Sequence, residues 1–295
     1  MDAQQWYESG SMIEVNGRKL FVYDSDSSNS DNKPVLLILH GYPTCSYDYF
    51  KSLPYLEDKF RVIIHDHLGF GYSDKPQDYS YLLIDQTDFA LNLWKLLGIT
   101  KAHILAHDYG TSVATEIIAR NCEKKSLNIE ILSVTLCNGS IHIEMSKLRF
   151  IQKLLLNKIS GPIVARLSNK KTLSKNLQNI FYDKNKIKQF EIDALWHMMT
   201  YNNGRKVLHN VTQYIKQRYH NWDRWIGGLK STHLNIHIVW AKNDPVAIVK
   251  IARTIHQECK NSDLLILRNL GHFPMLEDPK TWSKNIIASI LNSNH

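Results

Sequence analysis

The sequence predicts an α/β fold in which a mostly parallel, doubly wound sheet carries an inserted helical cap. Three observations lead to this prediction: apolar runs typical of buried strands alternate with helical patterns, one long internal stretch has helical patterns alone, and polar residues stand directly after several of the apolar runs. The chain has 295 residues, of which 43% are hydrophobic and 22% charged, so it can form one such domain with an insertion.

The predicted strands and helices follow one another in a regular order. Residues 12–24 predict two short strands joined at Asn16-Gly17, a dipeptide that favours tight hairpin turns. The apolar runs that predict further strands are Val35–Leu39, Arg61–Ile64, Ala102–Leu105, Ile131–Leu136, Ile236–Trp240 and Leu264–Leu267. The helical patterns that separate or follow them are Ile84–Leu97, Thr111–Ala119, Val246–Glu258 and Lys280–Leu291. Such alternation is typical of a parallel sheet with helices on both faces.

The alternation stops in the middle of the chain. Only helical stretches are found there, including Met145–Leu156, Ile192–Tyr201 and Lys206–Arg218. A helical insertion between two parallel strands lies over the strand ends, where ligands bind. We therefore predict a core domain of residues 1–140 and 230–295 and a cap of residues 141–229, which we call the cap segment.

Basic residues concentrate in the cap segment, although the whole chain has a formal net charge of only +8. Between Ile141 and Phe190 the acids are Glu144 and Asp183. The bases in the same stretch are Lys147, Arg149, Lys153, Lys158, Arg166, Lys170, Lys171, Lys175, Lys184, Lys186 and Lys188. This basic cap could contact an anionic surface, an acidic partner or an anionic substrate, or it could be a solvated exterior. No nucleic-acid-binding module accompanies the charge, so we expect no nucleic-acid partner.

The remaining composition narrows the class of protein. Four scattered cysteines, Cys45, Cys122, Cys137 and Cys259, form no pair or cluster, which predicts buried thiols and no metal site. No apolar stretch approaches the roughly 18 residues of a membrane span, and the N-terminus lacks the basic and apolar regions of a signal peptide. We expect a cytoplasmic protein, monomeric or dimeric, without a membrane span.

The junction after Ala102–Leu105 has the sequence shape of a nucleophile elbow. The apolar run ends at Ala106, the chain turns through Asp108, and Gly110 leads into the next helix. The flanking residues must be small because a strained turn that exposes one side chain leaves no room for bulk. Aspartate, with an unperturbed pKa of about 3.9, is already an anion at neutral pH. It can displace a leaving group from saturated carbon, whereas serine needs a base and attacks acyl carbon.

Two residues after later strands complete a triad with Asp108. Asp244 follows Ile236–Trp240 directly, and His272 follows Leu264–Leu267 by a few residues. The order nucleophile, acid, histidine is that of α/β-hydrolases. We expect His272 to activate water as a general base, and Asp244 to fix its tautomer and orientation.

An oxyanion hole is expected from two backbone N–H groups. One belongs to Tyr109, next after the nucleophile, and the other to Tyr42, in His40-Gly41-Tyr42-Pro43 after the first core strand. The alternative for this second motif is an ordinary turn at the end of a strand.

Other residues compete for these roles. Asn138 stands after Ile131–Leu136, where some aspartate-nucleophile enzymes carry the triad acid, but an amide cannot carry the charge. Asp244 is therefore the better candidate, with Glu144 a remote second. As nucleophiles, Ser112 lies inside a predicted helix and Ser73 lies in a loop, so neither competes with Asp108.

Four motifs of this chain resemble the epoxide hydrolase and haloalkane dehalogenase branch of the α/β-hydrolase superfamily, and within it mesoderm-specific transcript-like proteins. They are His40-Gly41-Tyr42-Pro43, the stretch Leu68–Pro76, His107-Asp108-Tyr109-Gly110 and the stretch Gly271–Pro279. The resemblance implies the α/β-hydrolase fold and a two-step reaction on a small hydrophobic substrate and water, without a cofactor. Asp108 attacks an electrophilic carbon to form an alkyl-enzyme ester, and water activated by His272 hydrolyses that ester.

Members of this branch differ in what assists the leaving group. Epoxide hydrolases use cap tyrosines, for which the resemblance suggests Tyr214 with Tyr182 or Tyr201, and Trp196 is a further substrate-contact candidate. Haloalkane dehalogenases hold the halide with the residue after the nucleophile, usually Trp, where this chain has Tyr109. We therefore expect an epoxide hydrolase-like enzyme. The alternatives are a haloalkane dehalogenase and a hydrophobic-ligand-binding protein with little turnover.

Overall fold

The computed structural model describes residues 1–124, 127–146 and 148–292, and Lys147, one of the bases counted above, lies outside them. Its strands form a single sheet in the order β1-β2-β4-β3-β5-β6-β7-β8. They are β1 (Ser11–Val15), β2 (Arg18–Asp24), β3 (Val35–Leu39), β4 (Arg61–His65), β5 (Lys101–His107), β6 (Glu130–Cys137), β7 (Asn235–Ala241) and β8 (Ser262–Leu267). β2 pairs antiparallel with β1 and β4, and every other neighbouring pair is parallel. The mostly parallel α/β fold is thus confirmed.

Helices lie before, between and after the strands. Outside the cap segment they are α1 (Ala3–Glu8), η1 (Ser46–Tyr49), α2 (Leu53–Leu56), α3 (Leu83–Leu96), α4 (Tyr109–Cys122), α12 (Val249–Glu258), α13 (Pro274–Glu277) and α14 (Pro279–Leu291). Between β6 and β7 they are η2 (Ile143–Met145), α5 (Phe150–Leu156), α6 (Ser160–Leu167), α7 (Lys170–Gln178), α8 (Gln189–Thr200), η3 (Tyr201–Lys206), α9 (Leu208–Val211), α10 (Tyr214–His220) and α11 (Trp222–Ser231).

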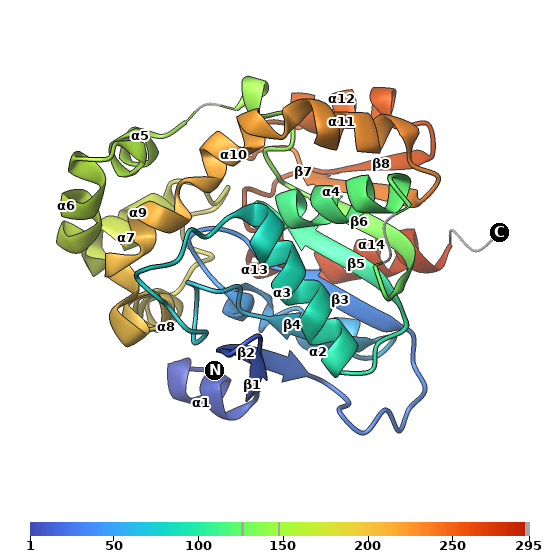
Figure 1. Cartoon of the computed structure of the whole chain (residues 1–295), viewed down its shortest axis with the longest axis horizontal. Helices are drawn as coiled ribbons and strands as arrows, with labels where there is room; N and C mark the ends of the chain where they lie inside the picture. Colours follow the sequence, from blue (N-terminus) through green and yellow to red (C-terminus); the bar gives the residue numbers. More distant parts are fainter. Residues whose placement is uncertain (125–126, 147, 293–295) are drawn as a thin grey trace.

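The sheet is buried on both faces, as expected for a doubly wound fold. In β3, Leu37 and Leu39 belong to the core on one face, and Leu36 and Ile38 belong to the core on the other. α3, α4, α11 and α12 supply the apolar side chains that cover the first face, while α2 and α14 cover the second (Figure 1). This layering leaves the loops after the parallel strands to build a site.

Two local predictions have different outcomes. The hairpin is confirmed, because Asn16 and Gly17 take φ values of 51° and 73° between β1 and β2. The single helix predicted over Lys206–Arg218 is wrong, since α9 ends at Val211 and α10 begins at Tyr214. The break arises where backbone hydrogen bonds tighten to a three-residue spacing, with the Gln213 N–H donating to the Asn210 carbonyl at 3.0 Å.

The cap segment divides into two parts in space. α5 to α9 gather at one end of the molecule, whereas α11 packs along α4 over the sheet (Figure 1). Across the described residues, no helix combines the length and apolar character needed to cross a membrane.

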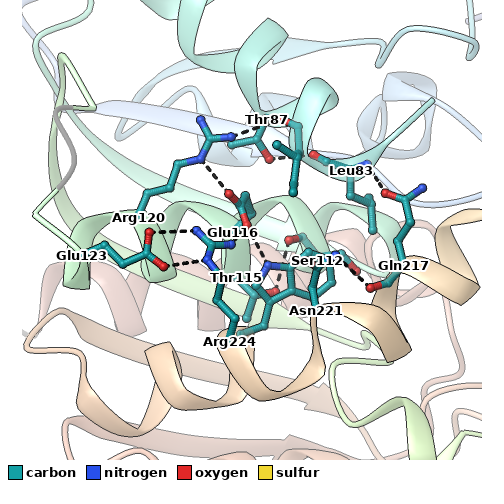
Figure 2. Close-up of polar contacts among 12 residues, drawn as sticks. Leu83, Thr87, Ser112, Thr115, Glu116, Arg120, Glu123, Gln217, Asn221 and Arg224 are labelled. Atoms are coloured by element: carbon teal, nitrogen blue, oxygen red, sulfur yellow. Dashed lines mark hydrogen bonds and ion pairs between the residues drawn. The ribbon is translucent and has the colours of Figure 1, made fainter. Parts of the chain in front are cut away.

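A buried carboxylate joins α4 to α11. Glu116 accepts hydrogen bonds from Arg120 Nε at 2.7 Å and from Trp225 Nε1 at 2.7 Å, and it also pairs with Arg224. Figure 2 shows this network, in which Arg224 also reaches Glu123. Although burial raises the pKa of Glu116, the hydrogen bonds from its partners outweigh that effect and lower the pKa below its usual value. The ionised carboxylate therefore stabilises the fold at neutral pH.

We expect Glu116→Ala to lower the free energy of unfolding by about 2–4 kcal/mol, because the buried Trp225 N–H loses its acceptor and Arg120 and Arg224 each lose one of their two carboxylate partners. Asp88→Asn is a matched control, since Asp88 pairs with the same Arg120 but its side chain is 49% exposed, and exposed pairs contribute about 0–1 kcal/mol. Urea unfolding measures both variants. Equal losses in the two variants would contradict the structural role of Glu116.

Candidate active site

Asp108 stands in the turn between β5 and α4. Its φ and ψ are 43° and −104°, in the left-handed half of the map that an aspartate seldom occupies. The turn needs glycine nearby, because a Cβ at Gly110 would lie 2.3 Å from the Leu39 carbonyl oxygen. The Gly110 N–H instead donates to the His40 carbonyl at 2.9 Å. The strained elbow expected from the sequence is therefore packed tightly against the end of β3.

The Asp108 carboxylate is 4% exposed and has two neighbours with N–H groups. The Tyr42 backbone N–H donates to Oδ2 at 2.9 Å. On the other side, Nη2 of Arg218 lies 4.0 Å from Oδ1. The Tyr42 amide is thus directed at the Asp108 carboxylate, and the Tyr109 amide follows Asp108 at the first position of α4. That these two amides form an oxyanion hole stays a prediction.

Arg218 is the residue of this site that sequence reasoning missed. It reaches from α10 to the elbow and is 2% exposed. Its Nε donates to Ser112 Oγ at 2.7 Å and its Nη2 to the Asp108 carbonyl at 3.0 Å, while its guanidinium lies 4.6 Å from the centroid of the Tyr214 ring. The sequence feature that could have identified Arg218 is its four-residue spacing from the candidate Tyr214, which places both side chains on one face of a helix.

His272 and Asp244 form the hydrogen-bonded pair expected of a base and its orienting acid. Nδ1 of His272 lies 2.8 Å from Asp244 Oδ2, and both residues are buried. Burial alone lowers the pKa of His272, but the Asp244 charge and hydrogen bond, with the Asp108 charge, raise it above its usual 6.5. Nε2 of His272 has no hydrogen-bond partner in the part of the chain that the structure describes, and the residue lines the same cavity as Asp108.

Asn138 and Glu144 have other partners than His272. Asn138 Nδ2 donates to Asp244 Oδ2 at 2.8 Å, and its own oxygen accepts from the Ala241 N–H at 3.0 Å. Glu144 accepts from Trp222 Nε1 at 2.7 Å and lies 2.7 Å from His142. The amide therefore positions Asp244, whereas Glu144 belongs to a separate contact between η2 and α11.

A cavity of about 290 Å³ lies between the strand ends and the cap segment. Tyr42, Asp108, Arg218 and His272 line one part of it. The rest of its wall is largely apolar and is supplied mainly by cap helices, including Ile151, Leu155, Val164, Leu167, Leu173 and Leu177. An apolar chain with one reactive group suits this shape.

The cap candidates differ in position. Tyr214 lines the cavity, and burial raises its pKa well above its usual value, so its hydroxyl stays protonated. The other three candidates do not line the cavity. Tyr182 is 51% exposed, and Tyr201 packs against Tyr72. Trp196 packs against the core on the sheet face that α2 and α14 cover. The Tyr109 ring also lies outside the cavity lining, against Phe70 and Tyr214.

The two serines weighed as nucleophiles have other contacts. Ser112 lies within α4 and accepts from Arg218, and Ser73 Oγ donates to the Asp66 carbonyl at 2.6 Å. Among the described residues, no group of three or more His, Cys, Asp or Glu side chains could hold a metal ion.

Comparison with known proteins places the chain in a family. A family model described as alpha/beta hydrolase fold matches residues 34–279. The chain is 33% identical to the Mesoderm-specific transcript protein of Mus musculus over 98% of this chain and 87% of that protein. It is also 30% identical to LipZ of Mycobacterium tuberculosis over 98% of both chains.

Shorter matches support the resemblance to the epoxide hydrolase and haloalkane dehalogenase branch. Epoxide hydrolase 1 of Caenorhabditis elegans is 38% identical over 30% of this chain and 22% of its own length. Haloalkane dehalogenase of Bradyrhizobium diazoefficiens is 33% identical over 37% of this chain and 36% of its own length. A crystal structure of DBJA shares the fold, with a TM-score of 0.81 at 16% identity over 96% of this chain and 98% of that chain. The chain belongs to the α/β-hydrolase fold family.

Proposed function

We propose that this protein is a hydrolase that uses Asp108 as its nucleophile, forms a covalent alkyl-enzyme ester, and acts on epoxides. The observation that carries the proposal is the carboxylate at the elbow, which borders an apolar cavity together with His272. A carboxylate in this place has no proton to lose before it attacks, so it needs no base in the first step.

In the first step, Oδ1 of Asp108 attacks a ring carbon of the epoxide. The carbon–oxygen bond of the ring breaks and its electron pair moves to the ring oxygen. The Tyr214 hydroxyl lines the cavity and remains protonated, so it can donate to this oxygen. Arg218 adds a fixed positive charge beside the reacting carboxylate, and its Nη1 makes no hydrogen bond within the described chain. Tyr214 and Arg218 can therefore stabilise the negative charge as it moves from the carboxylate to the ring oxygen.

In the second step, water attacks Cγ of the Asp108 ester. Nε2 of His272 takes the proton from that water, while Asp244 stabilises the imidazolium that forms. Oδ2 becomes the oxyanion and accepts from the Tyr42 N–H, which already donates to it at 2.9 Å, and from the Tyr109 N–H. The ester bond then breaks, and the departing oxygen takes back the proton held by His272. The second proton of the attacking water leaves the new carboxyl group of Asp108 and, through solvent, replaces the proton that Tyr214 gave to the ring oxygen, so that Asp108 and Tyr214 are regenerated and the diol leaves.

Epoxides fit the cavity lining better than haloalkanes. A hydroxyl donor, Tyr214, lines the cavity, whereas the side chain after the nucleophile, Tyr109, does not. Haloalkane dehalogenases of this branch hold the halide with the residue after the nucleophile. In this chain that residue does not contribute to the cavity wall.

Replacement of His272 by Gln should leave the first step intact and block the second, because Gln cannot take a proton from water. We expect mass spectrometry of the variant after incubation with aryl and alkyl epoxides to find a covalent adduct on the peptide that contains Asp108. Asp108→Asn is the matched control and should carry no adduct. The parent enzyme should form diol from epoxides faster than it releases halide from short bromoalkanes.

If the His272→Gln variant forms no adduct with either the epoxides or the bromoalkanes, the proposal is contradicted. Faster halide release than diol formation would favour a haloalkane dehalogenase. Unchanged ligand affinity in Asp108→Ala, with no turnover in the parent, would indicate a binding protein.

Hydrolysis of the ester should depend on pH through His272. Only the neutral imidazole accepts a proton, so the rate should rise with pH through the pKa of His272, which lies above 6.5. In Asp244→Asn the carboxylate that raises this pKa is lost, so the rise should move to lower pH and the maximal rate should fall by roughly 10²–10⁴-fold. Single-turnover decay of the adduct against pH measures both effects. A rise at the same pH in both proteins would show that Asp244 does not act on His272.

A further inference from the structure

The outer surface of α5 and α6 carries unusually exposed apolar side chains. Ile159, Phe150 and Leu167 are 81%, 76% and 72% exposed, more than any other large hydrophobic side chain of the described chain, and Ile163 is 56% exposed. The two helices contact each other at one end of the molecule (Figure 1). Proteins seldom gather such side chains in water without a partner.

α6 has its apolar side chains on the outer side. Ile159, Ile163 and Leu167 recur every four residues and so lie along one stripe. The buried residues of α6 are the small Gly161 and Ala165, and a Cβ at Gly161 would lie 2.5 Å from the Leu155 carbonyl oxygen of α5. Gly161 thus packs closely against α5, whereas Ile159, Ile163 and Leu167 reach solvent and Val164 lines the cavity. An ordinary surface helix buries most of its large apolar side chains.

Exposed basic side chains occur along the same stretch of the chain. Lys153, Lys158, Arg166 and Lys171 are exposed, and within the described chain none of them forms an ion pair. The acids of the stretch 141–190 lie elsewhere: Glu144 is bound to Trp222 and His142, and Asp183 precedes α8. Projecting apolar side chains interspersed with bases match the boundary between acyl chains and anionic headgroups.

The same surface borders the cavity that leads to Asp108. Leu167 is exposed to solvent and also lines the cavity, while Ile151, Leu155 and Val164 of α5 and α6 form its wall. We propose that the surface formed by α5, α6, the residues between them and the start of α7 (Phe150, Ile159, Ile163 and Leu167, with Lys153, Lys158, Arg166 and Lys171) docks on an anionic lipid bilayer. An apolar substrate dissolved in the bilayer then reaches the cavity without crossing water. The docking surface does not depend on which reaction Asp108 performs.

Binding to vesicles tests this surface. The full chain should bind phosphatidylcholine vesicles that contain phosphatidylglycerol more tightly than vesicles of phosphatidylcholine alone, and salt should weaken the binding. The triple variant Phe150→Ser, Ile159→Ser, Ile163→Ser should bind these vesicles at least about tenfold more weakly than the parent. The triple variant Lys153→Gln, Lys158→Gln, Arg166→Gln should lose at least as much affinity. None of these residues lines the cavity.

A matched control is available on α3, where Lys95 and Leu96 are both exposed on another part of the molecule. Lys95→Gln with Leu96→Ser should bind vesicles like the parent, and circular dichroism should show all variants folded. No vesicle binding by the parent, or equal binding by parent and triple variants, would overturn the proposal. Light scattering that shows a dimer lost in the triple variant, with vesicle binding unchanged, would instead assign the surface to a contact between two copies.

Discussion

The backbone turn at Asp108 is the constraint on which the site depends. A positive φ at a residue other than glycine typically costs about 1–3 kcal/mol, and here β3 and α4 hold it in place. The absence of a side chain at Gly110 lets α4 start directly against the Leu39 carbonyl, and the Gly110 N–H is bonded to His40. The turn therefore presents the Asp108 carboxylate both to the Tyr42 N–H, in the loop after β3, and to the cavity.

Burial of a carboxylate at this turn requires compensating charge. Arg218 supplies it from α10 and is itself buried, bound to Ser112 and to the Asp108 carbonyl. Breaking such a buried pair leaves a charge without a partner, which is usually far more costly than loss of an exposed pair. One residue of the cap segment thereby links α10, Asp108 and the start of α4. The same link keeps a cation beside the position where negative charge would develop.

The sequence predicted the parts of the site that strand order determines. Asp108, Asp244 and His272 each follow a strand of a parallel sheet, so their common edge follows from topology. Side chains of the cap segment were harder to predict because their direction depends on packing between helices. Tyr182 and Tyr214 look alike in sequence, yet the first is 51% exposed and the second 2%. Arg218 was missed because arginine is seldom buried without a partner, and its partner lies 110 residues away.

The origin of the oxygen in the product tests the central claim, that Asp108 is the nucleophile. With enzyme in excess over an aryl epoxide in H₂¹⁸O, the first turnover transfers an oxygen of the Asp108 carboxylate to the diol, and water replaces it in the enzyme. We predict unlabelled diol and ¹⁸O in the peptide that contains Asp108. Labelled diol with an unlabelled peptide would mean that water attacks the substrate directly, and it would contradict the account.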